Sequence, residues 1–358
     1  SFPSCASTAL AFRPHSPSGR GAHLRKANPP AGAPVRPCDL AALQKSCHVL
    51  TRRMVPAGQD GGGQSATISR TRKMTSKLQQ FFADTGTLAE IRECDRLDNS
   101  DLFFNPVDGG FDICVENRIR FEYRDDGGVA CLCLPGTTPA ELELWHKGSV
   151  MGLAAWCRGL VALHVSAIQA GGGLVALAGD SGAGKSTLAA ALGAHGYPLF
   201  ADDTLILDRQ DGALVAMPGH KRLKLWDNAF DLTGAVRGEQ LQPGIDKYFA
   251  RNASTSSAAL LPLTDLVLLA ETDDPEPKFR QVRGAEKIQR CADALYRPDL
   301  YSRIAKGQDH AALMLELSAK LRIWEFARSR NRQLFDKTTQ YLARNLAGLK
   351  PSNITQSD

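Results

Sequence analysis

The 358-residue chain has no apolar run that approaches the roughly 20 residues a membrane-crossing helix needs. None of its nine cysteines forms a Cys-x-x-Cys pair, and no His or Cys stands at zinc-finger spacing from Cys131 and Cys133, so a zinc site is not expected. It also has no internal repeat. We therefore expect a cytoplasmic protein with reduced thiols and no membrane partner.

Acidic residues are scarce at the start of the chain. Residues 1–74 contain eleven Lys or Arg, only two Asp or Glu, eight Pro and the run Gly61–Gly63, a composition typical of disorder. This segment fits an organellar transit peptide, a basic arm for an acidic partner, or an inert tail ahead of a true start at Met74, and we favour the last. The rest of the chain has a slight acidic excess, so no nucleic-acid partner is expected.

One complete motif stands out among these residues. Residues 179–186 follow the G-x-x-x-x-G-K-[ST] pattern of a phosphate-binding loop (P-loop). The apolar run Leu174–Ala178 before it predicts a buried strand, and Thr187–Leu192 after it predicts a helix. Glycines let successive N–H groups converge on phosphate oxygens, and the helix N-terminus adds partial positive charge there. The predicted nucleotide-binding residues are Gly179, Asp180, Ser181, Gly182, Ala183, Gly184, Lys185, Ser186 and Thr187.

Specific chemistry is expected of several side chains near this loop. Lys185 would reach the β- and γ-phosphates of a nucleotide, and the Ser186 hydroxyl would bind Mg²⁺. Asp202 and Asp203 end the next predicted strand, Tyr197–Ala201. One of them could hold the metal or its waters while the other accepts a proton from an acceptor hydroxyl. The alternative is that the pair only caps a turn.

His164 lies in the predicted strand Leu163–Ala167, which would pair with the P-loop strand through the turn Gly171–Gly173. A histidine in a strand can be a satisfied core residue or a catalytic one. Its position beside the P-loop keeps both interpretations open.

Together these residues resemble the catalytic domain of HPr kinase/phosphorylase. That family combines a strand His, a G-D-S-G-x-G-K-S loop, a short H-G linker and an A-D-D strand end, matched here by His164, 179–186, His195–Gly196 and Ala201–Asp203. The match is close from Leu163 to Asp208 and looser from Ala89 to Arg328. The resemblance implies that Asp203 is the proton acceptor, that Lys185 and Ser186 serve phosphate and Mg²⁺, that Asp202 supports the metal, and that His164 is a further active-site residue.

The chain also departs from that family. The metal-binding Glu of an E-I-R-G-L-G-type segment is missing, and Pro218–Trp226 stands in its place. The separate N-terminal domain of the full-length regulator is also missing. The chain is more similar to smaller peptide-modifying members such as lasso-peptide kinases, in the segments Leu223–Trp226, Asp246–Lys247 and Tyr296–Pro298.

The resemblance implies an ATP- and Mg²⁺-dependent kinase that phosphorylates a serine hydroxyl of a peptide or protein. A small-molecule kinase of the same fold, and a nucleotide-binding regulatory protein without productive transfer, remain alternatives. The acceptor, reversibility and a homo-oligomeric state stay open. Five cations form either a solvated face or contacts to phosphate or acceptor: Lys221, Arg222, Lys224, Lys247 and Arg251.

The implied fold class is α/β, a P-loop core of HPr kinase/PEP-carboxykinase-like type with a mixed sheet flanked by helices. A single catalytic domain is expected over 75–349, and 350–358 would be a disordered tail. Helices are predicted over 138–157, 286–296 and 311–321, and the polar stretch 234–257 is predicted to be a mobile loop or a surface insertion. Within the domain we expect an antiparallel β meander over 88–134, the P-loop core over 160–330 and a last helix over 331–347.

Overall fold

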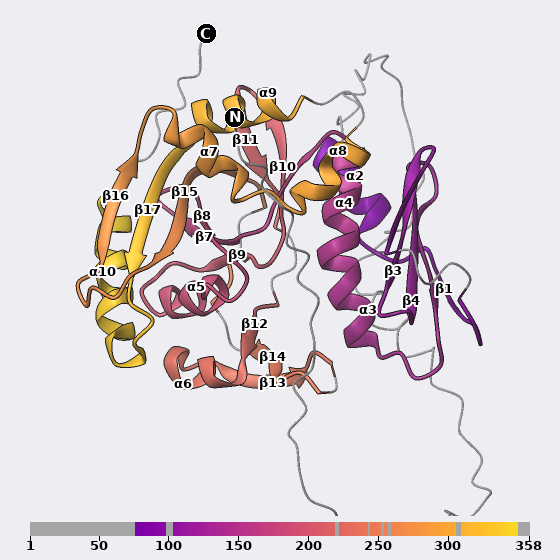
Figure 1. Ribbon diagram of the computed structural model, residues 1–358, viewed down its shortest axis with the longest axis horizontal. Coiled ribbons are helices and arrows are strands. Elements are labelled where there is room, and N and C mark those ends of the chain that lie inside the picture. Colours follow the sequence, from indigo (N-terminus) through magenta and orange to yellow (C-terminus); the bar gives the residue numbers. More distant parts are fainter. Residues whose placement is uncertain are drawn as a thin grey trace, which may run out of the picture. The chain divides into compact units, whose positions relative to one another are not determined.

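The computed structural model describes residues 76–97, 103–218, 222–242, 244–251, 254–256, 259–305 and 309–349. The predictions for residues 1–74 and 350–358, and for Lys221, lie outside these ranges. The described residues form a mixed α/β fold in which helices pack on three β-sheets (Figure 1). In these ranges, no helix combines the length and the apolar character that crossing a membrane requires.

The first described element is helix α2 (Lys77–Thr85), which no sequence prediction covered. A capping box starts it, because the Ser76 hydroxyl accepts the Gln79 N–H and the Gln79 side chain accepts the Ser76 N–H. A five-stranded sheet follows in the order β1-β5-β4-β3-β2. Its strands are β1 (Glu90–Glu93), β2 (Phe104–Val107), β3 (Gly110–Val115), β4 (Ile119–Arg124) and β5 (Gly128–Cys133).

Strands β2 to β5 pair antiparallel, but β1 pairs with β5 in parallel. The prediction of a wholly antiparallel meander was therefore wrong for its first strand. The parallel pairing places β1 beside β5, the last of the five strands along the chain. The alternation of apolar and polar residues within a strand does not predict which strands pair over such a distance.

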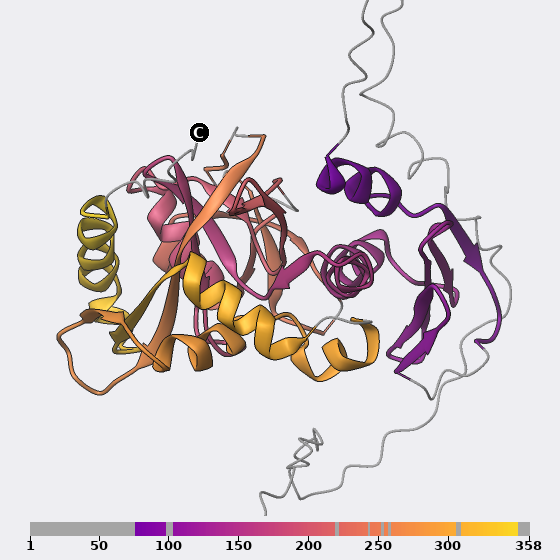
Figure 2. The same ribbon diagram turned by 90° about the horizontal axis from the view of Figure 1, so that it is seen from above.

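A long helical segment leaves this sheet and leads to the main sheet. It consists of α3 (Pro139–Trp145), a π-helical turn (His146–Val150) and α4 (Met151–Cys157). Thr138 and Glu141 form a second capping box at its start. Figure 2 shows this segment nearly end-on, between the five-stranded sheet and the main sheet. The π turn lies inside the predicted helix, and such turns concentrate at functional sites.

The main sheet has nine strands and carries the P-loop motif. Strands β6, β10, β11, β15, β8, β7 and β9 follow one another in space, and β17 and β16 extend the sheet from β15. Strand β15 pairs in parallel with β8 on one side and with β17 on the other. The bounds are β6 (Val161–Leu163), β7 (Ser166–Ala170), β8 (Gly173–Ala178), β9 (Leu199–Ala201), β10 (Leu205–Gln210), β11 (Ala213–Ala216), β15 (Leu261–Glu271), β16 (Lys278–Val282) and β17 (Arg322–Arg328).

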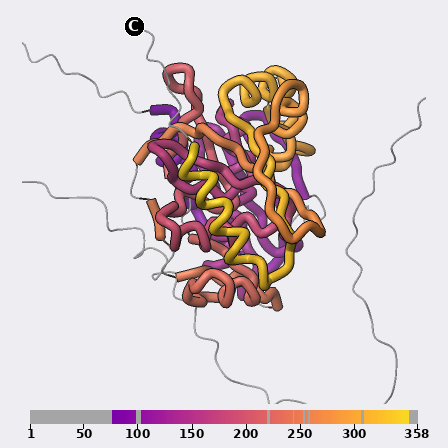
Figure 3. Tube along the Cα trace, turned by 90° about the vertical axis from the view of Figure 1, so that its left-hand side faces the viewer, coloured from indigo at the N-terminus to yellow at the C-terminus, as the bar shows by residue number. Residues whose placement is uncertain are grey.

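Helices cover both faces of this sheet, and β8 shows why. Leu174, Ala176 and Ala178 face the hydrophobic cluster that contains α4, α7 (Glu286–Ala292), α8 (Pro298–Ile304) and α9 (His310–Lys320). Val175 and Leu177 face the opposite cluster, which contains α5 (Lys185–Gly193) and α10 (Phe335–Ala347). A strand that is buried on both faces reads as a continuous apolar run. Figure 3 shows α10 crossing the outer face of the strands.

A small third sheet lies next to α5. It consists of β12 (Lys224–Trp226), β14 (Lys247–Arg251) and β13 (Val236–Gln240), with a 3-10 turn (Asp227–Ala229) and α6 (Phe230–Thr233) after β12. The prediction of a mobile loop over 234–257 was therefore wrong where β13 and β14 form. Their polar, short strands lack the apolar alternation that marks a strand in a sequence.

Two further predictions need correction. His164 lies between β6 and β7 and not inside one strand. The helix predicted over 286–296 ends at Ala292, and α8 and β16 were not predicted. The N-cap of helix α8 is Arg297, which has a left-handed φ of 44°, and an arginine there does not indicate a helix start in the sequence. The hairpin of β7 and β8 across Gly171 and Gly172 has the antiparallel pairing that was predicted.

Candidate active site

The P-loop joins the end of β8 to the start of α5. Gly179, Gly182 and Gly184 have φ angles of 147°, 83° and 87°, a region that favours glycine. Gly184 is the N-cap of α5, so the helix N-terminus opens directly behind the loop. The backbone N–H groups at the start of α5 and the helix dipole make the loop suited to phosphate.

Arg328, at the end of β17, holds the P-loop through a hydrogen bond to its backbone. It is 8% exposed, and its Nη2 donates to the carbonyl oxygen of Ala183 over 2.7 Å. A Cβ at Gly184 would lie 2.6 Å from the same nitrogen, so a larger residue would have to displace the Arg328 guanidinium as well as adopt the left-handed φ. The sequence analysis did not single out Arg328 as a site residue, because β17 reaches the P-loop only through its pairing with β15.

Asp202 is a buried hydrogen-bond acceptor behind the loop, 3% exposed. Its Oδ1 accepts the hydroxyls of Ser166 over 2.7 Å and of Ser186 over 2.9 Å. Its Oδ2 accepts the backbone N–H of Lys224 over 3.2 Å. Asp202 therefore ties β7, α5 and β12 together, and it fixes the rotamer of Ser186.

Asp203 points the other way, into the cavity in front of the loop. Its backbone has a left-handed φ of 74°, which turns its side chain away from that of Asp202. Its Oδ2 lies 3.1 Å from the Nζ of Lys224, which is 4% exposed. Burial raises the pKa of Asp203, but the charge and hydrogen bond of Lys224, the charge that His164 carries in acid and the charge of Lys247 outweigh it and hold that pKa at about 2.

His164 contacts the same residue from the connection between β6 and β7. Its Nδ1 lies 3.0 Å from the backbone oxygen of Asp203 and 3.5 Å from its Oδ1. Burial and the charge of Lys185 lower the pKa of His164 against the opposing effect of Asp203, so the ring is neutral at pH 7. A neutral ring that donates from Nδ1 holds the strained backbone of Asp203 in place.

Lys185 is folded onto its own loop. Its Nζ donates to the carbonyl oxygens of Gly179 over 2.8 Å and of Asp180 over 3.3 Å. Burial lowers the pKa of Lys185, and the carboxylates of Asp203 and Asp202 oppose that change. A phosphate in the loop would offer the ammonium a charged acceptor in place of these carbonyls.

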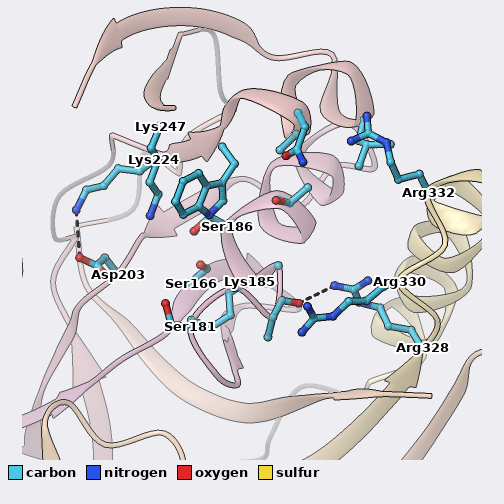
Figure 4. Close-up of a pocket in the computed structure, with 18 of the residues that line it drawn as sticks. Ser166, Ser181, Lys185, Ser186, Asp203, Lys224, Lys247, Arg328, Arg330 and Arg332 are labelled. Atoms are coloured by element: carbon cyan, nitrogen blue, oxygen red, sulfur yellow. Dashed lines mark hydrogen bonds and ion pairs between the residues drawn. The ribbon is translucent and has the colours of Figure 1, made fainter. Parts of the chain in front are cut away.

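These groups line one cavity of about 590 Å³. In Figure 4, Asp203 and Lys224 lie on one side of the P-loop residues, and Arg328, Arg330 and Arg332 lie on the other. The lining is formed by His164, Ser166, Ser181, Gly182, Ala183, Gly184, Lys185, Ser186, Thr187, Asp203, Lys224, Trp226, Asn228, Ala229, Leu232, Lys247, Arg328, Arg330 and Arg332. Of the predicted nucleotide-binding residues, Gly179 and Asp180 are outside this lining.

The cations whose roles were open now separate into two groups. Lys224 and Lys247 line the cavity, and the Nζ of Lys247 lies 5.5 Å from the centroid of the Trp226 ring. Arg222 and Arg251 do not line it. Arg222 instead pairs with Glu143 and lies over the Phe249 ring at 3.6 Å. Arg222 is thus explained by its pairing and packing, and Arg251 is an exposed residue of β14 outside the site.

The oxygen donors of Ser186 and Asp202 have the chemistry that Mg²⁺ prefers, but they are not equivalent. Asp202 is buried and already accepts three hydrogen bonds, so it fits a role through Ser186 or through a water better than direct coordination. The residues that the structure describes contain no cluster of three or more His, Cys, Asp or Glu suited to hold a metal. Mg²⁺ commonly takes its other ligands from phosphates and water.

Comparison with known proteins gives little beyond this geometry. No family model matches the chain, and no curated protein matches it. Among solved structures it is similar to the Hpr(Ser) kinase/phosphatase from Coxiella burnetii, at 14% sequence identity and a TM-score of 0.27. That match covers 52% of this chain and 96% of the other. Because the likeness is so distant, we base the function on the site itself.

Proposed function

We propose that the protein is an ATP-dependent kinase that transfers the γ-phosphate to a hydroxyl, and that its acceptor is a serine of a peptide or protein. The observation that carries the proposal is the position of Asp203. Its carboxylate faces the same cavity as the P-loop, beside three lysines. A protein that only binds nucleotide has no need for a carboxylate at that position.

Phosphoryl transfer depends mainly on positioning and on neutralising charge, and the cavity supplies both. The P-loop and Lys185 hold the triphosphate, and Lys224 and Lys247 face the γ-phosphate end next to Asp203. Mg²⁺ would be held by Ser186, with Asp202 behind it. When bound, it neutralises charge on the β- and γ-phosphates.

Asp203 would accept the proton of the attacking hydroxyl. With a pKa of about 2 it is ionised and ready to accept, although it is a weak base. A triphosphate brings negative charge close to it and competes for Lys224 and Lys247, which raises that pKa toward a useful value. His164 keeps the carboxylate in place through the backbone of Asp203.

The acceptor is tested by incubating the protein with Mg²⁺, ATP labelled with ¹⁸O in the γ-phosphate, and a library of serine peptides. Mass spectrometry should find the heavy phosphate on serine, and Lys185→Ala should give none. ATP consumption without a labelled peptide would contradict the peptide acceptor and favour a small molecule. Absence of any ATP turnover would contradict the kinase and favour a nucleotide-binding regulatory protein.

A further inference from the structure

The end of the cavity opposite Asp203 has no role in the transfer chemistry described above. Two walls form it. One wall follows β17 and contains Arg330 and Arg332, and the other contains Asn228, Ala229 and Leu232 from the turn after β12 and from α6. Figure 4 shows the arginines beyond the P-loop, on the side away from Asp203.

The direction of a bound triphosphate follows from the P-loop itself. The lysine of such a loop reaches the β- and γ-phosphates, while the loop amides and the helix start hold the α- and β-phosphates. The γ-phosphate therefore lies toward Asp203 and Lys247. The α-phosphate lies toward the first turn of α5, where Thr187 lines the cavity. Whatever is attached to the α-phosphate must leave toward the two walls.

We propose that the slot between these walls binds the nucleoside of a purine nucleoside triphosphate. The base lies between the guanidinium plane of Arg332 and the apolar side chain of Leu232, with Asn228 available to the ribose hydroxyls. A guanidinium stacks well on a planar base, and a purine offers it more area than a pyrimidine. This inference rests on the nucleotide-binding part of the proposed function.

The pairing of the arginines favours a nucleoside over a second anion in the slot. Arg330 lies 2.7 Å from Glu271, and Arg332 lies 3.7 Å from Asp231. Each arginine thus has a carboxylate beside it that disfavours a second anion there, whereas the cavity-lining Lys247 forms no ion pair among the described residues. Arg332 and Asp231 are 48% and 83% exposed, so the pair is weak and the guanidinium can turn to face a base.

The test compares two ligands that differ only at the nucleoside end, Mg-ATP and Mg-tripolyphosphate, by isothermal titration calorimetry. Arg332→Ala and Leu232→Ala should each weaken ATP binding roughly tenfold, the loss expected for one stacking partner. Neither should change the affinity for tripolyphosphate. Arg344→Ala, an exposed arginine on α10, is the control and should bind both ligands like the wild type.

Two further measurements separate stacking from charge. Arg332→Lys keeps the charge and loses the plane, so it should behave like Arg332→Ala. The preference of the wild type for ATP over CTP should shrink in Arg332→Ala. Equal losses for ATP and tripolyphosphate, or full affinity in Arg332→Lys, would overturn the nucleoside slot while leaving the kinase proposal standing. Absence of wild-type binding to either ligand would overturn both.

Discussion

At the scale of single residues, the site depends on two backbone angles. Gly184 and Asp203 both have left-handed φ, of 87° and 74°. At Gly184 this angle opens the helix N-terminus toward the cavity. At Asp203 it separates two adjacent carboxylates, so that Asp202 is buried behind Ser186 while Asp203 faces the cavity. The residues alone left the division of roles between the two open, and the family resemblance assigned the proton acceptor to Asp203. The structure shows that Asp203 lines the cavity and that Asp202 does not.

Gly184→Ala tests the P-loop at this scale. The added Cβ would meet Arg328 at 2.6 Å and strain φ, so ATP affinity should fall by about tenfold or more. Gly196→Ala is the matched control, because Gly196 has a φ of 86° with nothing within 4 Å. It should cost about 1 kcal/mol of stability and leave ATP binding unchanged, as measured by titration and thermal unfolding. Equal affinities of the two variants would contradict the role of Gly184.

The ion pair of Asp203 predicts a pH dependence of stability. Its pKa of about 2 is below the ordinary value of 3.8, so the ionised form stabilises the fold above about pH 4. That contribution is lost as the pH falls from about 4 to about 2. Urea unfolding of the wild type and Asp203→Asn at about pH 5 and about pH 2.5 should show a stability difference that shrinks in acid. A difference that is constant with pH would contradict the ion pair.

At the scale of elements, amphipathic and apolar patterns predicted the P-loop strand, the helix after it and the β7–β8 hairpin. They did not predict the π turn His146–Val150 or the small sheet of β12, β13 and β14. The helical spacing of apolar residues continues through the π turn. The polar strands of the small sheet are held by their neighbours and not by their own propensity. The small sheet lines the cavity through Lys224, Trp226 and Lys247, and the π turn lies against Asp203. Sequence rules commonly fail at such places.

The π turn brings a glycine against the proposed base. A Cβ at Gly148 would lie 3.1 Å from Oδ2 of Asp203 and 3.7 Å from the hydroxyl of Tyr296. Gly148→Ala should displace the carboxylate and lower kcat by about tenfold to a hundredfold with little change in ATP affinity. Gly152→Ala, whose Cβ would meet the Tyr296 ring at 2.6 Å, should instead lower the melting temperature. Unchanged kcat in Gly148→Ala would show that this contact does not matter.

At the scale of the whole described fold, one strand connects the two ends of the site. Strand β15 pairs with β8, which leads into the P-loop, and with β17, which leads to Arg328. Asp265 of β15 is 1% exposed and accepts from Arg322 over 2.6 Å and from Trp324 over 2.8 Å, both on β17. Nothing in the local sequence around residues 322–332 indicates this long-range pairing. This explains why Arg328, Arg330 and Arg332 were not predicted to line the cavity.

Asp265→Ala should therefore destabilise the fold strongly. Removal of the Asp265 carboxylate takes away an acceptor of the partly exposed Arg322 guanidinium and of the Trp324 indole N–H, at about 1–3 kcal/mol for each group left unsatisfied. The exposed Asp273, on the segment after β15, gives the control Asp273→Ala, which should stay within about 0.5 kcal/mol of the wild type. Chemical unfolding checks both variants. Similar unfolding midpoints would contradict the role of Asp265 in joining β15 to β17.

The central claim is that Asp203 performs transfer while the P-loop performs binding. The most direct measurement compares ATP affinity and γ-phosphate transfer in the wild type, Asp203→Asn and Lys185→Ala. We predict that Asp203→Asn binds Mg-ATP about as well as the wild type and transfers at least about a hundredfold more slowly, and that Lys185→Ala loses both. Undiminished transfer in Asp203→Asn would contradict the account, because the cavity would then carry out its chemistry without the carboxylate that defines it.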